Sequence, residues 1–235
     1  MKIIFPLLAL FSMYAAHANN IIVNGTRFIY SEDVAEITIH MTNTGNSPSL
    51  AQIWLDEGDP EKLPEDITTP FIISPPIARV DAGNGQSLRI KKAADRRISA
   101  TDRESLWWLN ILDIPSVDKS KVTENSSMLN LAIRSRFKFF WRPAGLGERQ
   151  NAESKMQILA NNGDITLVNP TPFFITVADI VTASGNGLLR EGVMVAPKSS
   201  STITAKHNVR RGEAVFLQAV SDYGSVVEFK TTINQ

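Results

Sequence analysis

Hydrophobic and polar residues alternate most regularly between Ser127 and Pro143. Apolar side chains fill most odd-numbered positions from Leu129 to Trp141, and Arg or Lys fills most even-numbered positions up to Arg142. A period of two residues indicates a β-strand with one apolar face and one basic face. At ~3.3 Å per residue such a strand would extend for roughly 45 Å. Its apolar face needs a partner, which is either the core of the same chain or another protein.

Shorter strand-like segments recur along the rest of the chain, with clusters of Gly, Pro, Asn and Ser between them. No segment shows a sustained 3.6-residue apolar stripe of helix length, so the pattern predicts an all-β fold. The strand-like segments are residues 34–41, 50–55, 87–90, 106–114, 156–159, 164–169, 173–180, 200–205, 214–220 and 226–233.

A short link of small residues, Ala144 to Gly147, divides these segments into two groups of roughly six or seven strands. This number suits two β-sandwiches of immunoglobulin type, with a boundary near residue 145. We expect an N-terminal domain over residues 19–144 and a C-terminal domain over residues 145–235. Because the link is short, the angle between the domains should be restricted.

The beginning of the chain has the features of an export signal. Lys2 precedes an apolar run from Ile3 to Tyr14, and Ala16-His17-Ala18 has the small-x-small pattern that a signal peptidase recognises. We therefore expect residues 1–18 to be a signal peptide cleaved after Ala18, the alternative being an uncleaved anchor. No other stretch approaches ~20 apolar residues, so no stable membrane anchor is expected.

Composition excludes several classes of function. The chain has 24 basic and 24 acidic residues, so its net charge does not favour nucleic acid as a partner. It contains no cysteine, which excludes disulfides, thiolate zinc sites and cysteine nucleophiles. An exported chain of this kind must hold its fold by burial and hydrogen bonding alone.

Catalytic motifs are also missing from the sequence. His40 and His207 are far apart, and neither belongs to a HExxH metal motif. The sequence has no G-x-S-x-G nucleophile motif and no glycine-rich phosphate loop ending in Lys-Ser or Lys-Thr. We therefore expect no enzyme, no metal and no cofactor, and a secreted hydrolase has no triad on which to build.

Six short motifs, spread over nearly the whole chain, together resemble the PapD-like family, the periplasmic chaperones of the chaperone-usher pilus pathway. They follow one another in the order that is found in the family. The motifs are Thr26-Arg27, Ser74-Pro75-Pro76 with Arg79, Asp102-Arg103-Glu104-Ser105-Leu106, Lys138 to Pro143 (KFFWRP), Asn169-Pro170-Thr171-Pro172 and Asp222-Tyr223-Gly224.

The resemblance implies two immunoglobulin-like domains in a boomerang arrangement, located in the periplasm. It also implies ATP-independent binding of pilus or fimbrial subunits by donor-strand complementation, in which the chaperone lends a missing strand. The subunits would then be delivered to an outer-membrane usher. Self-association through the exposed edge strand is a further expectation.

The same resemblance assigns roles to individual residues. Arg27 and Lys138 would anchor the C-terminal carboxylate of the subunit, the alternative being two solvated surface charges. Leu129, Leu131 and Ile133 would be the donor-strand residues, the alternative being a place in the domain's own core. A bulge between Ile133 and Lys138 would reverse which side chains share a face.

Glu104, Arg142 and Asp222 would form an interdomain ion network that fixes the domain angle, the alternative being unpaired surface positions. The polar segment 116–127 is either a mobile loop or an ordered surface hairpin. The absence of cysteine beside the donor strand favours the short-loop subgroup of the family. An exported two-domain binding module, such as an adhesin or receptor-like protein, remains the alternative function.

Overall fold

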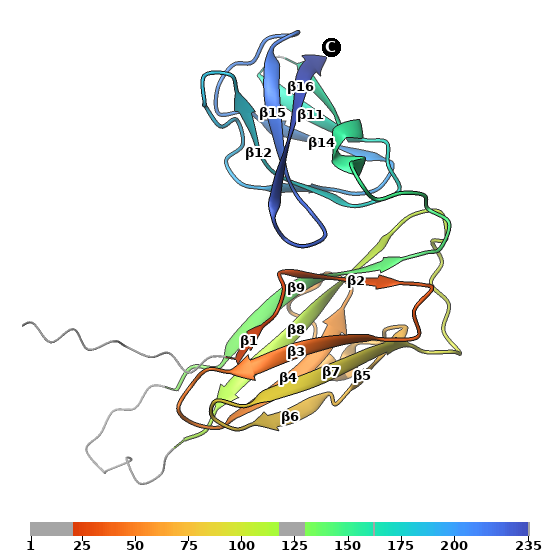
Figure 1. Ribbon diagram of the computed structural model, residues 1–235, viewed down its shortest axis with the longest axis vertical. Coiled ribbons are helices and arrows are strands. Elements are labelled where there is room, and N and C mark those ends of the chain that lie inside the picture. The colour runs from red at the N-terminus through yellow and green to blue at the C-terminus, as the bar shows by residue number, and fades with distance from the viewer. Residues whose placement is uncertain (1–20, 118–129, 162, 235) are drawn as a thin grey trace, which may run out of the picture.

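The computed structural model describes residues 21–117, 130–161 and 163–234, and it is built almost entirely from β-strands (Figure 1). The all-β prediction is confirmed. In these described ranges two short 3-10 helices, Pro64–Asp66 and Ala152–Lys155, interrupt the strands. The predicted signal peptide and Leu129 lie outside the described residues. Within those residues, no helix has the length and apolar character that a membrane crossing requires.

The first domain is a sandwich of two sheets, with strand orders β1-β3-β7-β5 and β2-β9-β8-β4-β6. All pairs in it are antiparallel except β2 and β9, which run parallel. The strands are β1 Ile21–Val23, β2 Arg27–Ser31, β3 Ile37–Asn43, β4 Ser49–Asp56, β5 Phe71–Ser74, β6 Ile77–Val80, β7 Gly85–Lys92, β8 Ser105–Pro115 and β9 Ile133–Arg142.

Alternation places the apolar side chains of this domain between its two sheets. In β3, Ile39 and Met41 are buried while His40 between them is exposed. This strand begins three residues later than the pattern predicted, because Val34 N donates a hydrogen bond to Ser31 O in the turn after β2. Tyr30, Phe71, Phe139 and Trp141 form an aromatic group in the core, with ring centroids 5.0–6.3 Å apart.

The alternating stretch noted in the sequence becomes β9, which begins at Ile133. Residues 130–132 precede the strand, so the described strand is shorter than the pattern predicted. The register between β8 and β9 is continuous from Asp113↔Ile133 to Ser105↔Trp141. No bulge interrupts it, and odd-numbered and even-numbered side chains therefore keep to opposite faces along the whole strand.

The second domain is a seven-stranded sheet of order β13-β12-β15-β16-β10-β11-β14, which folds around its own apolar core. A short parallel pairing of β10 with β16 joins its two halves. The strands are β10 Gln157–Asn161, β11 Asp164–Asn169, β12 Ile175–Thr182, β13 Val193–Val195, β14 Ser199–Thr204, β15 Ala214–Val220 and β16 Val226–Asn234.

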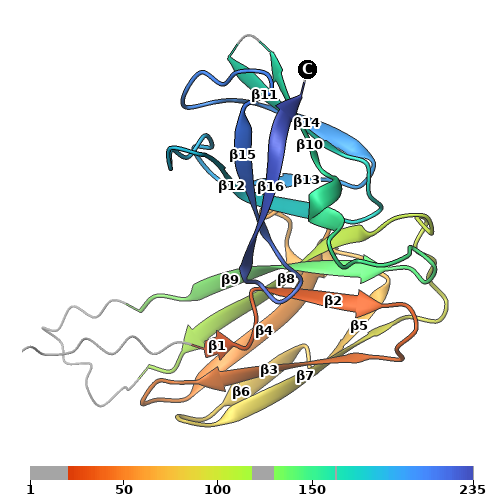
Figure 2. The same cartoon turned by 45° about the horizontal axis from the view of Figure 1, so that its top comes forward.

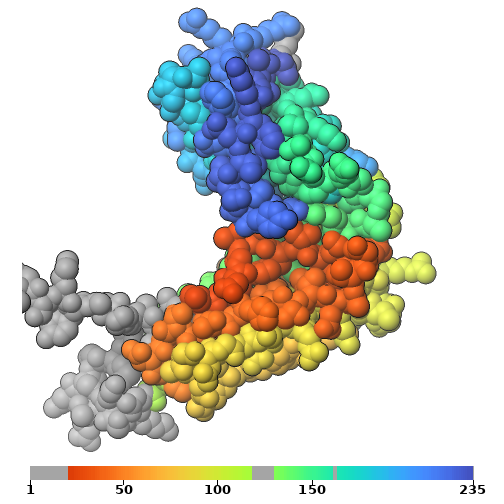
Figure 3. Space-filling model, in the orientation of Figure 1, coloured from red at the N-terminus to blue at the C-terminus, as the bar shows by residue number. Residues whose placement is uncertain are grey.

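The two domains meet at an angle, so the molecule is bent at their junction (Figures 1 and 3). In both cartoon views the turn between β15 and β16 reaches down to β2 of the first domain (Figures 1 and 2). Gly224 in this turn has φ +83° and lies so close to Thr26 that a Cβ atom would collide with the threonine hydroxyl. Glycine is required there for both reasons.

Candidate functional site

Arg27 and Lys138 lie side by side where the two domains meet. Arg27 is the first residue of β2, and it is the direct register partner of Lys138 in the parallel pairing with β9. Each cation also contacts the second domain. Arg27 Nη1 donates to Val220 O at 3.3 Å, and Lys138 Nζ donates to Thr176 Oγ1 at 3.1 Å. Strand pairing thus brings together two positive charges that are far apart in the sequence.

Both cations are partly removed from water. Burial lowers the pKa of Arg27 from its ordinary value. Burial also lowers the pKa of Lys138 to about 8, and the positive charge of Arg27 acts in the same direction. Neither side chain forms an ion pair with a carboxylate in the described part of the chain, and Arg27 Nε is buried without a hydrogen-bond partner there. An anion placed between them would relieve the repulsion and accept charge-assisted hydrogen bonds.

Beyond Lys138, the N-terminal half of β9 has a free edge. β8 pairs with β9 from Ile133 to Trp141, whereas β2 pairs only from Lys138 to Arg142. Among the described residues, no strand therefore covers the β2 side of residues 133–137, which we call the free edge. Such an edge can accept a further strand.

Apolar side chains accompany the free edge on the surface. Leu131 is 62% exposed and Ile133 is 44% exposed, so neither belongs to the core of its own domain. Large apolar side chains exposed together with unpaired backbone mark a binding surface.

An ion network joins the two domains beside this site. Arg142 Nε lies 2.6 Å from Glu104 Oε1, and Arg142 Nη1 lies 2.8 Å from Asp222 Oδ2 in the β15–β16 turn. Glu104 also accepts a hydrogen bond from Phe174 N at 2.8 Å, and its own N–H donates to Pro172 O. The structure thus brings Glu104, Arg142 and Asp222 together across the domain junction.

Burial affects the ionisation of this network. It raises the pKa of Glu104, and the nearby charge of Arg142 offsets only part of the effect. Burial alone would lower the pKa of Arg142, but its hydrogen bond to Asp222 and the charge of Glu104 raise it instead. The charges therefore stabilise one another in a partly dehydrated place.

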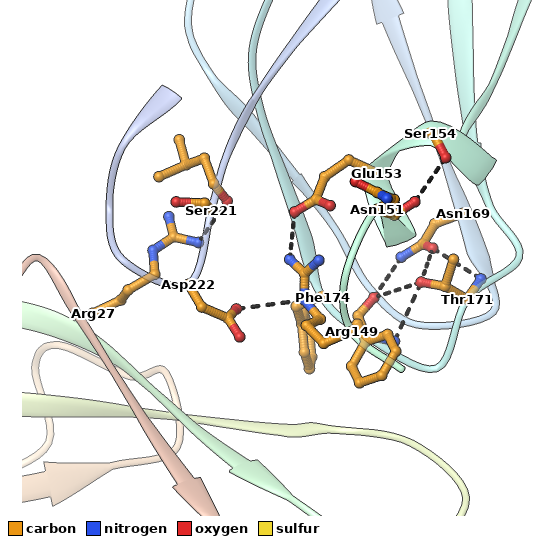
Figure 4. Close-up of polar contacts among 12 residues, drawn as sticks. Arg27, Arg149, Asn151, Glu153, Ser154, Asn169, Thr171, Phe174, Ser221 and Asp222 are labelled. Carbon is orange, nitrogen blue, oxygen red and sulfur yellow. Dashed lines mark hydrogen bonds and ion pairs between the residues drawn. The ribbon is translucent and has the colours of Figure 1, made fainter. Parts of the chain in front are cut away.

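The sequence analysis gave no indication of Arg149 or Glu153 at the junction. Arg149 lies between Glu153 and Asp222, with Nη2 2.7 Å from Glu153 Oε1 and Nε 3.4 Å from Asp222 Oδ1 (Figure 4). Asn169 and Thr171 order the neighbouring loop by hydrogen bonds to each other and to Phe173 O (Figure 4). The Asn169-Pro170 motif pointed to this loop, but no sequence pattern indicated Arg149.

No group of three or more His, Cys, Asp or Glu side chains within the described residues could hold a metal ion. The carboxylates at the junction are instead paired with Arg142 and Arg149.

Comparisons with known proteins identify relatives over almost the whole chain. The family model described as pili and flagellar-assembly chaperone, PapD N-terminal domain, matches residues 20–147, and that described as pili assembly chaperone PapD, C-terminal domain, matches residues 151–231. Chaperone protein MrkB of Klebsiella pneumoniae is 51% identical over 220 residues, which are 94% of each chain. Chaperone protein FimB/FhaD of Bordetella pertussis is 35% identical, covering 94% of this chain and 91% of its own length. The crystal structure of the YadV chaperone, 30% identical, superposes with a TM-score of 0.75 and covers 91% of this chain and 99% of its own.

Proposed function

The chain belongs to the PapD family of pilus-assembly chaperones, and we propose that it stabilises incomplete pilus subunits by lending them a strand and anchoring their C-terminus. It then passes them to an outer-membrane usher. Its two immunoglobulin-like domains confirm the predicted fold class. The function is binding without catalysis, and its free energy comes from apolar burial and backbone hydrogen bonds, without ATP.

The free edge of β9 is the observation that carries this proposal. A subunit strand that pairs with residues 133–137 would occupy the backbone positions that β2 leaves open. Leu131 and Ile133, together with Leu129 before them, would then fill the place of the missing core side chains of the subunit. Burial of a side chain of this size contributes roughly 1.5–3 kcal/mol. Without a subunit, the same edge is open to a second copy of the chain, which gives a route to self-association.

Arg27 and Lys138 would hold the carboxylate at the C-terminus of the subunit. Both cations have lost part of their hydration in the free protein, which disfavours their charges. An anion bound between them therefore contributes more binding free energy, because its negative charge stabilises the cations in place of the lost water. Anchoring at this point would also fix the register of the subunit along β9, since Lys138 directly follows the free edge.

Glu104, Arg142 and Asp222 would fix the domain angle rather than contact the subunit. Their bonds cross the junction, and removing one partner would leave a buried charge without compensation. The Arg27 contact with Val220 and the Lys138 contact with Thr176 depend on the same angle.

We further propose export to the periplasm, with residues 1–18 removed as a signal peptide. Residues 19–144 would form the domain that supplies the donor strand, and residues 145–235 would form the domain that completes the anchor.

The test is co-expression in the periplasm with a pilus subunit that lacks its own final strand, followed by purification through a tag on the chaperone. A stoichiometric complex is expected with the wild type and with Lys91→Ala, an exposed control lysine on β7. Lys138→Ala and Arg27→Ala should remain folded but recover no soluble subunit. Normal recovery by both anchor variants would refute the anchoring role, and no complex with any subunit would favour the exported binding module instead.

A further inference from the structure

A cluster of charged and aromatic side chains lies on the face of the five-stranded sheet that also carries Lys138. It consists of Trp54 and Asp56 of β4, Trp108 and Asn110 of β8, and Arg134 and Arg136 of β9. We call it the Asp56 cluster. In the sequence, Arg134 and Arg136 belong to the basic face of the alternating stretch, and no motif indicates the other members of the cluster.

Asp56 is the centre of the cluster and is only 1% exposed. Arg136 forms an ion pair with it through Nη2, and Arg136 Nε lies 3.3 Å from Asp56 Oδ2. Arg134 Nη2 approaches the same carboxylate at 3.6 Å. Burial alone would raise the pKa of Asp56, but hydrogen bonds from Arg136 and Asn110 lower it below the ordinary value. The carboxylate of Asp56 is thus charged at neutral pH, and both arginines lie close to it.

Other side chains of β4 and β8 also contact Arg134 and Arg136. Arg134 Nε donates to Asn110 Oδ1 at 2.8 Å, and Asn110 Nδ2 donates to Asp56 Oδ2 at 2.7 Å. The guanidinium of Arg136 lies 4.5 Å from the ring centroid of Trp108, and that of Arg134 lies 5.0 Å from the ring centroid of Trp54. Cation–π contacts of this geometry add to the ion pairs.

The cluster acts on the part of β9 that has the least other support. Residues 133–137 have a strand on one side only, and Ile133 and Arg134 are exposed. A segment with few buried contacts opens locally at little cost in free energy. Arg134 and Arg136 alternate with Ile133 and Ser135, so holding the arginines on one face fixes the direction of the residues on the other.

We propose that Asp56 is a positioning residue for donor-strand binding. By holding Arg134 and Arg136, it keeps residues 133–137 extended on β8 before a subunit arrives. The inference rests on the proposed function, because it assumes that the free edge receives the subunit. Ordering the strand in advance removes an entropy cost that binding would otherwise carry. The apparent affinity of a site falls in proportion to the fraction of molecules in which it is formed.

The test compares the wild type with Asp56→Asn, which removes the charge at constant shape. Arg134→Met is a milder second variant, which loses one ion pair and keeps an apolar contact with Trp54. Asp81→Asn is the matched control, because Asp81 forms an exposed ion pair with Arg79 elsewhere in the domain. Amide hydrogen exchange of the free proteins and affinity for a subunit without its final strand are measured for each.

In Asp56→Asn, the amides of residues 133–137 that donate to β8 should exchange at least tenfold faster, while those of residues 139–141 and of β3 stay as in the control. Affinity for the subunit should fall at least tenfold, with smaller changes of the same kind in Arg134→Met. Exchange that accelerates throughout the domain would overturn the proposal, since it would indicate a general structural role. Unchanged exchange and affinity in both variants would overturn it as well.

The anchor variant separates this proposal from the proposed function. If Lys138→Ala loses the subunit while Asp56→Asn binds it as the wild type does, only the positioning role fails. If the wild type binds no incomplete subunit, the proposed function fails, and the role of Asp56 in donor-strand binding fails with it.

Discussion

Raising the pH from 7 to 9 should weaken subunit binding, because it removes the charge from one of the two anchoring cations. The pKa of Lys138 in the free protein is about 8, owing mainly to burial and also to Arg27. A guanidinium keeps its charge over this range, so Arg27 contributes no change. A bound carboxylate favours the charged lysine and therefore raises its pKa in the complex.

The magnitude follows from the fraction of free protein that carries the charge. With a pKa of about 8, roughly nine-tenths of the lysine is charged at pH 7 and roughly one-tenth at pH 9. If the complex keeps the lysine charged at pH 9, affinity falls about tenfold between these values, and binding takes up a proton above pH 8.

The assay is isothermal titration calorimetry at pH 7, 8 and 9 with an incomplete pilus subunit, in two buffers of different ionisation enthalpy. Lys138→Met should bind more weakly, without this pH dependence and without proton uptake. Lys91→Ala should behave as the wild type. Equal affinity at pH 7 and pH 9 in the wild type, or the same decline in Lys138→Met, would refute the reasoning.

Stability of the free protein should change in the opposite direction. The pKa of Lys138 in the folded state lies below the ordinary value of 10.5, so the fold disfavours the charged form. Its contribution to stability therefore rises as the pH increases from about 8 to about 10.5. Thermal unfolding over this range separates loss of binding from alkaline unfolding.

Four further substitutions test other parts of the molecule. Leu131→Ser and Ile133→Ser should each weaken subunit binding by about 1–2 kcal/mol, because each loses apolar burial in the complex. Calorimetry should show an unchanged unfolding temperature of the free protein. Unchanged affinity for the subunit would contradict their donor role. Arg142→Met leaves Glu104 buried without its partner and should cost about 3 kcal/mol of stability in urea unfolding. A loss no larger than that of Asp81→Asn would contradict its structural role. Asn169→Ala removes hydrogen bonds to Phe173 O, Val195 O and Ala196 O and should cost about 2 kcal/mol in the same assay. An effect near zero would show that water replaces the amide.

The local pattern of the sequence predicted the longer strands well. β11 and β15 have the predicted bounds, β8 is longer than predicted by one residue at each end, and β16 is longer by one residue at its C-terminal end. The short strands β1, β2, β5, β6 and β13 were not predicted, because three to five residues rarely show a clear alternation. One of them, β2, carries half of the proposed anchor.

The sequence by itself determined the all-β class and the two-domain organisation, and its resemblance to the PapD-like family pointed to Arg27, Glu104, Lys138, Arg142 and Asp222, but not to Arg149. A period of two residues is a local property of the extended chain, and the junction residues belong to short motifs that can be read in place. The roles of Arg27, Lys138, Leu131 and Ile133 remain predictions.

Only the tertiary structure decided how these residues meet. Register between strands remote in sequence places Arg27 beside Lys138, lets β2 begin its pairing with β9 only at Lys138, and sets Arg134 and Arg136 over Asp56. Burial at the junction then lowers the pKa of Lys138 and makes it sensitive to pH. The physical reason is that strand pairing and desolvation depend on which distant segments pack together, and no local pattern contains that information.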